Sequence, residues 1–191
     1  MKTELPIGMS NRHIHLSQGD LEILFGEGYE LTRRKDLSQP GQFAAEEKVD
    51  LIGPKRAIKG VRVLGPVRSA TQVEVSISDA FTLGVEPVIR NSGDIKDTPG
   101  IKVIGPKGEI DLKEGVIVAA RHIHMHTDEA KEFGVKDGDV VSVKVGGVRG
   151  ITFDNVLIRS GEGHKLEMHV DIEEGNAAGT KNGDLVEIIN K

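Results

Sequence analysis

Two copies of a histidine pair are the residues of this sequence best suited to chemistry. His13 and His15 lie in a segment Arg-His-Ile-His, and His122 and His124 lie in a second copy that continues to His126. Residues two apart in a β-strand point to one face, whereas on a helix they diverge by about 200°. Each copy therefore offers two imidazoles on one strand face, and paired neutral imidazoles suit zinc and related first-row metals.

A third metal ligand must come from the polar face of another strand. In residues 72–78 (QVEVSIS) the period-two alternation turns Glu74 away from the apolar face, and in residues 166–172 (LEMHVDI) it does the same for His169. Either residue could complete a three-ligand site, while His164, in a glycine-rich turn, is expected to be solvated. The alternative is that the histidines are partly exposed without a metal and that Glu74 lies on a solvated strand face.

The elements that must hold these residues are mostly short strands. Alternating runs bounded by Gly, Pro, Asn or Asp recur along the chain, at 61–65, 72–78, 139–145 and 184–189. Aromatic residues make up 3% of the sequence, so the core must be built mainly from Val, Ile and Leu, which favours strands. Helical patterns are confined to 17–26, with Ser17 as N-cap and Gly26 as its end, and to 126–134, with Thr127 and Gly134 in those roles.

A weak internal duplication divides the sequence into two similar units. Each Arg-His-Ile-His segment precedes a short predicted helix, which ends in LFG in the first copy and in EFG in the second. Short strands with few helices predict a mainly β fold of two small β-barrels in tandem, capped by short α-helices.

Composition excludes several classes of function. The net charge of -5 and the absence of a basic stretch with interleaved aromatics argue against a nucleic-acid surface. The sequence has no Cys, which excludes disulfides, thiolate zinc sites and cysteine nucleophiles, and it has no G-x-S-x-G nucleophile elbow. Neither a signal sequence nor a run of about 20 apolar residues is found, so we expect a cytoplasmic protein with no membrane contact.

Long segments over nearly the whole chain resemble the PduL-type phosphate propanoyltransferases, a family of phosphotransacylases. The segments are NRHIHLS (11–17), residues 35–55, VRVLGPVR (61–68), VEVSISDAFTLG (73–84), PVIRNSGDIKDTPG (87–100), AARHIHM (119–125), FDNVLIR (153–159) and MHVDIEEGNAAG (168–179).

The resemblance implies a domain organisation and two zinc ions per chain, placed between the barrels. A first barrel with its capping helix is expected over 12–119, and a second over 120–191, completed by an N-terminal strand at 1–11. By this resemblance, His13, His15 and Glu74 bind one zinc and leave a position open for the substrate, and His122, His124 and His169 bind the other zinc. The resemblance also implies that Arg68 binds phosphate and is catalytic. Phe81 is implied to lie near the coenzyme A nucleotide, unless it is an ordinary core aromatic.

The function implied by the resemblance is the exchange of coenzyme A for phosphate. A short-chain acyl-CoA, propanoyl-CoA or acetyl-CoA, reacts with phosphate to give the acyl phosphate and coenzyme A, by direct zinc-assisted attack of phosphate on the thioester. Zinc acts as a Lewis acid in such chemistry, and a guanidinium matches phosphate geometry bidentately. Two rival functions remain: a zinc hydrolase such as a thioesterase, and a binding module in which the zincs are purely structural.

The resemblance also bears on partners and location. Family members are associated with propanediol degradation, and those that enter bacterial microcompartments carry an amphipathic N-terminal extension, whereas here about ten residues precede His13. A free cytoplasmic enzyme is therefore expected, with a bacterial microcompartment as the alternative location. A homodimer is expected as well.

Overall fold

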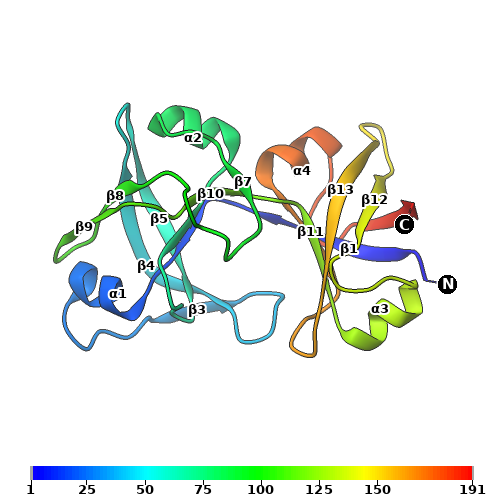
Figure 1. The fold of residues 1–191 in the computed structure, drawn as a ribbon, viewed down its shortest axis with the longest axis horizontal. Coiled ribbons are helices and arrows are strands. Elements are labelled where there is room, and N and C mark those ends of the chain that lie inside the picture. Colours follow the sequence, from blue (N-terminus) through cyan, green and yellow to red (C-terminus); the bar gives the residue numbers. More distant parts are fainter. Residues whose placement is uncertain (1, 191) are drawn as a thin grey trace. The chain divides into compact units, whose positions relative to one another are not determined.

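The chain folds into two compact units, which we call the barrel unit and the sheet unit. The structure is a computed structural model that describes residues 2–190 (Figure 1). The barrel unit contains the described residues 2–11, 38–40 and 120–190, and the sheet unit contains residues 12–37 and 41–119.

The barrel unit is a closed β-barrel with two short helices. Its strands follow one another around the barrel in the order β1 (Glu4–Ser10), β14 (Glu167–Asp171), β11 (His122–Met125), β13 (Ile151–Ser160), β12 (Val140–Val145) and β15 (Leu185–Asn190). Helix α3 (Thr127–Phe133) follows β11, and α4 (Ile172–Ala178) follows β14. The N-terminal strand β1 closes the barrel because it pairs with β14 on one side and with β15 on the other.

The sheet unit is an open, curled sheet. Its strands lie in the order β7 (Ile89–Arg90), β10 (Val116–Ala119), β6 (Gln72–Glu74), β2 (His13–His15), β5 (Ala57–Gly65), β4 (Phe43–Ile52), β8 (Ile101–Ile104) and β9 (Glu109–Leu112), while β3 (Arg33–Asp36) pairs with β4. Helix α1 (Gln18–Phe25) follows β2, and α2 (Ile77–Leu83) follows β6.

The prediction of a mainly β protein with short helices is confirmed, although only the barrel unit forms a closed barrel. Helix α1 has Ser17 as its N-cap and Gly26 as its C-cap, as the sequence predicts. Helix α3 also ends at Gly134, but its N-cap is His126 rather than Thr127, because the His126 ring accepts the Asp128 N–H.

Helices α2 and α4 are not predicted by the sequence, and each begins within the last residues of an alternating run, 72–78 or 166–172. The alternation of residues 72–78 breaks after β6, where Ser76 caps α2, and Asp171 caps α4 in the same way. In both caps the side chain at the third helical position bonds back to the cap residue's N–H, forming a capping box.

Each unit has its own apolar core, and the isoleucine of each His-Ile-His segment lies within it. Ile14 is fully buried in the core of the sheet unit, and Ile123 is fully buried in that of the barrel unit. Because neighbouring residues of a strand face opposite sides, burial of the isoleucine turns both flanking histidines to the other face of the sheet. Among residues 2–190, no helix has both the length and the apolar character needed to cross a bilayer.

Truncation of a central isoleucine should destabilise its unit strongly. Ile123→Ala is expected to lower the free energy of unfolding by about 2–5 kcal/mol, because it removes buried methyl groups and leaves a cavity. Denaturant unfolding measures this, with Val148→Ala as the control, since Val148 is fully exposed and its loss should change stability by less than about 0.5 kcal/mol. Equal effects of the two substitutions would contradict the assigned core.

Candidate metal centres

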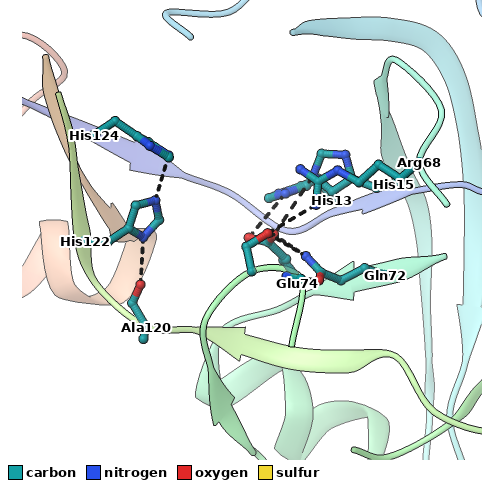
Figure 2. A network of polar contacts seen from close by, with 10 residues as sticks. His13, His15, Arg68, Gln72, Glu74, Ala120, His122 and His124 are labelled. Carbon is teal, nitrogen blue, oxygen red and sulfur yellow. Dashed lines mark hydrogen bonds and ion pairs between the residues drawn. The ribbon is translucent and has the colours of Figure 1, made fainter. Parts of the chain in front are cut away.

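The first histidine pair lies on β2, between β5 and β6. Strand β2 runs parallel to β5 and antiparallel to β6, in a register that sets His13 opposite Glu74 and His15 opposite Gln72. Both histidines and Glu74 are buried, and Figure 2 shows the carboxylate of Glu74 facing the imidazole of His13. The strand pairing therefore brings a carboxylate to two imidazoles.

The distances within this group fit a metal ion. Glu74 Oε2 lies 3.4 Å from His13 Nε2, and Glu74 Oε1 lies 4.0 Å from His15 Nε2. Zinc–ligand bonds of about 2.0–2.1 Å put neighbouring tetrahedral donor atoms roughly 3.3–3.4 Å apart. Within the part of the chain that the structure describes, these three residues form the group whose candidate donor atoms all lie within 4.8 Å of one another.

The protonation states of this group also favour metal binding. Burial lowers the pKa of His15 to about 3, and the charges of His13 and Arg68 act in the same direction. Burial alone would raise the pKa of Glu74, but the neighbouring imidazoles and a hydrogen bond from Ser92 hold it well below its usual range. A neutral imidazole and an ionised carboxylate are the forms that bind metals.

Arg68 is connected to this group through one serine. The Arg68 backbone N–H donates to Leu16 O at 2.9 Å, which holds the segment after β5 beside the end of β2. The Arg68 guanidinium Nη1 donates to Ser92 Oγ at 3.2 Å, and Ser92 Oγ donates to Glu74 Oε1 at 3.0 Å. An arginine is thus linked through Ser92 to a buried carboxylate, and both side chains are labelled in Figure 2.

The second histidine pair lies on β11 in an equivalent setting. Strand β11 runs parallel to β13 and antiparallel to β14, and the register sets His122 opposite His169 and His124 opposite Glu167. His122 Nε2 and His124 Nε2 are 3.2 Å apart, close to the separation of two zinc ligands, and the ring centroid of His169 lies 5.1 Å from each of the other two.

The second group is less closely gathered, since among residues 2–190 only the set His13, His15 and Glu74 has all its candidate donor atoms within 4.8 Å of one another. Its single imidazoles nevertheless have the character of metal ligands. His122 Nδ1 lies 2.8 Å from Ala120 O (Figure 2), and a ring that donates its Nδ1 proton there carries on Nε2 the lone pair that a metal needs. Burial lowers the pKa of His124 to about 2, helped by the charges of His122 and His169. Its Nδ1 is buried with no hydrogen-bond partner among residues 2–190.

Comparison with known proteins places the sequence of this chain in a family. A model of the phosphate propanoyltransferase family matches residues 6–181. The chain belongs to the phosphate propanoyltransferase family. The resemblance seen in the sequence is therefore confirmed, and so is the prediction of a transferase.

Curated relatives extend the similarity over almost the whole chain. A phosphate propanoyltransferase of Thermotoga maritima is 59% identical over 96% of this chain and 88% of its own length. The phosphate propanoyltransferase of Rhodopseudomonas palustris is 54% identical over 98% of this chain and 83% of its own length. That of Salmonella typhimurium is 52% identical over 93% of this chain and 85% of its own length.

Three further side chains of this phosphate propanoyltransferase family member were considered in the sequence, and the structure shows where each lies. Phe81, on α2, is 61% exposed, which excludes the alternative of a core aromatic. His164, expected to be solvated, is half-buried, with its ring centroid 4.4 Å from that of His124. His126 caps α3 and contacts Glu162, so it stands apart from the histidine pair of β11.

Sequence reasoning missed the residues that hold the ligand strands in place. In the sheet unit, Arg12 forms a two-bond ion pair with buried Asp79 at the third position of α2, with both N–O distances 2.8 Å. In the barrel unit, Arg121 Nε contacts Glu174 Oε1 at 2.9 Å at the third position of α4. The repeated arginine before His-Ile-His, and the acid five residues after each candidate third ligand, are the signals that could have found them.

The Arg12–Asp79 pair should contribute measurably to stability. Arg12→Ala is expected to cost about 1–3 kcal/mol, because it leaves a buried carboxylate without its cationic partner. Thermal or denaturant unfolding measures the loss. Lys131→Ala is the control, since Lys131 and its partner Asp128 are both largely exposed and water screens such a pair. A loss for Arg12→Ala no greater than the control's would show that the pair has no structural role.

Proposed function

We propose that this protein interconverts a short-chain acyl-CoA and phosphate with the acyl phosphate and coenzyme A. Its relatives carry the name phosphate propanoyltransferase, which favours propanoyl-CoA over other short acyl thioesters. The single observation that carries the proposal is the hydrogen-bonded link from Arg68 through Ser92 to Glu74, because it puts an anion-binding group beside a metal-binding group in one site.

Two zinc sites are part of this proposal. His13, His15 and Glu74 would hold one zinc, and His122, His124 and His169 would hold the other. When bound, zinc supplies Lewis-acid stabilisation of the negative charge that develops on the thioester oxygen and sulfur, an effect worth several kcal/mol.

The side chains of the protein supply the remaining functions. The Arg68 guanidinium donates hydrogen bonds to phosphate and orients it for attack. A phosphate oxygen forms a bond to the thioester carbonyl carbon, the carbon–sulfur bond breaks, and coenzyme A leaves as the thiolate. Since the sequence has no Cys, direct transfer is favoured over a thiol-linked acyl-enzyme. Exposed Phe81 offers a ring on which the adenine of coenzyme A can stack.

The reaction itself is tested by product analysis. The protein with zinc should release coenzyme A from propanoyl-CoA only when phosphate is present, and the other product should be propanoyl phosphate. Free thiol and hydroxamate-trapped acyl phosphate are measured together, with phosphate omitted as the control. Phosphate-independent thiol release with free propanoic acid as product would instead indicate a hydrolase.

Replacement of Arg68 should affect phosphate more than acyl-CoA. Arg68→Ala is expected to raise the KM for phosphate roughly ten- to a hundredfold, corresponding to a loss of about 1.5–3 kcal/mol for charge-assisted hydrogen bonds, with little change in the KM for acyl-CoA. Arg68→Lys should rescue poorly, because an ammonium lacks the planar fork. Equal changes in both KM values would assign Arg68 a structural role.

The two ligand sets should be separable by substitution. Glu74→Ala and His169→Ala are each expected to reduce zinc content from about two ions per chain to about one, with a loss of turnover. The reason is that each removes one of three donors, while the other set lies in a different unit with its own core. Zinc analysis, melting temperature and turnover check this. Glu74→Ala with two zincs and normal turnover would refute Glu74 as a ligand.

A further inference from the structure

Each candidate site contains four residues, which we call its frame: two histidines on one strand and the two residues that lie opposite them on the neighbouring strand. Each of the four positions is called a corner of the frame. In the sheet unit, His13 lies opposite Glu74 and His15 lies opposite Gln72. In the barrel unit, His122 lies opposite His169 and His124 lies opposite Glu167. The four residues of each set lie at alternate positions of two paired strands and so project to one face. Gln72 and Glu167 therefore occupy the same corner of their respective frames.

Both polar atoms of the Gln72 amide form hydrogen bonds, and one of these bonds goes to Glu74. Its Nε2 donates to Glu74 Oε1 at 2.6 Å and to Ser92 Oγ at 2.9 Å, while its Oε1 accepts the Gly93 N–H at 2.7 Å. The side chain is 2% exposed, so water cannot replace these bonds easily. Glu74 Oε1 accepts from both Gln72 and Ser92, which leaves Oε2, the oxygen nearer His13, for a metal.

Glu167 holds His169 by the complementary contact. Its Oε2 lies 3.0 Å from His169 Nε2, and Ser38 Oγ donates to the same oxygen. Gln39 completes the surroundings, because its amide pairs with the backbone N–H and C=O of Lys165 and its Nε2 lies 3.5 Å from His169 Nε2. A carboxylate that accepts an imidazole N–H fixes both the tautomer and the rotation of the ring.

A glycine leaves room for the Glu167 side chain. Gly8 on β1 pairs with His169, and a Cβ at position 8 would lie 2.9 Å from Glu167 Cδ and about as close to both carboxylate oxygens. The carboxylate is thus packed directly against the backbone of the neighbouring strand. Any side chain at position 8 would have to displace it.

The chemistry of each fourth corner matches the ligand beside it. A carboxylate ligand needs a donor, which the amide of Gln72 supplies, and an imidazole ligand needs an acceptor, which the carboxylate of Glu167 supplies. We propose that Gln72 and Glu167 are positioning residues that orient the third metal ligands, Glu74 and His169 respectively. This inference rests on the proposed metal sites but concerns metal affinity, so it can be tested apart from turnover.

Exchange of the two residue types tests the inference. Gln72→Glu puts a second carboxylate beside Glu74, and Glu167→Gln removes the charged acceptor beside His169. Each should weaken the binding of one of the two zincs by about 10- to 100-fold, the usual effect of losing a residue that orients a metal ligand. Zinc retention against a graded series of chelator concentrations measures affinity. The melting temperature of the metal-free protein is measured separately and should fall for Gln72→Glu, because this change buries a second carboxylate beside Glu74.

Two control variants make the same exchanges elsewhere. Gln18 donates to Glu22 Oε1 at 2.9 Å on the surface, and Glu162 Oε2 lies 3.3 Å from His126 Nε2, outside the frame. Gln18→Glu and Glu162→Gln should retain both zincs with unchanged affinity. Gly8→Ala is an independent variant at the barrel site, and it should weaken one zinc because it displaces the Glu167 carboxylate.

Combined substitutions separate positioning from general stability. Gln72→Glu should cause no further zinc loss when Glu74 is already Ala, and Glu167→Gln should cause none when His169 is already Ala, because each acts through that ligand. The inference is overturned if either exchange leaves zinc affinity at the wild-type value, or if its effect persists in full without the ligand.

The outcomes also distinguish this inference from the proposed function. Wild-type protein that binds no zinc under any loading condition would overturn both. Two zincs in the wild type, with affinities unchanged in the exchanged variants, would overturn the positioning role alone. The expected zinc losses in protein that fails to transfer the acyl group to phosphate would support the positioning role and overturn the proposed reaction.

Discussion

The antiparallel pairing between each His-Ile-His strand and its neighbour constrains everything else in both sites. Because side chains alternate across a strand, a slip of one residue would turn the histidines into the core and the isoleucine out of it. Full burial of Ile14 and Ile123 opposes that slip in each unit. The same register also fixes which residue of the neighbouring strand faces the imidazoles, so apolar packing on one face determines the polar constellation on the other.

Burial gives these polar groups their chemical character. An imidazole withdrawn from water favours the neutral form, as the depressed pKa values of His15 and His124 indicate, and a neutral ring presents a lone pair to a metal. Glu74 remains ionised because neighbouring imidazoles and hydrogen bonds outweigh its desolvation. A metal ion bound here would offset the desolvation cost of the buried carboxylate. The exclusion of water therefore both makes the carboxylate costly to bury and favours the binding of a cation.

The same strand arrangement thus holds two different sets of candidate metal ligands, one that includes a carboxylate and one made only of imidazoles. In each unit an arginine precedes the histidine pair and contacts an acid at the third position of the helix that follows the ligand strand, Asp79 in one and Glu174 in the other. Within that shared support, a carboxylate ligand would leave a bound divalent ion with less net charge than an imidazole ligand would. The two proposed metals would therefore carry unequal net charge.

The sequence by itself determined the strand character of the chain, the common face of each histidine pair and the cap residues of α1, since these follow from local periodicity. It also placed Glu74 and His169 on polar faces, and the family resemblance assigned one to each site. Only the tertiary structure decided that Gln72 and Glu167 occupy matching corners, that Ser92 links Arg68 to Glu74, and that residues 38–40 join the barrel unit. Alternation fixes the face of a residue but not its partner strand, and hydrogen bonds between distant segments leave no period in the sequence.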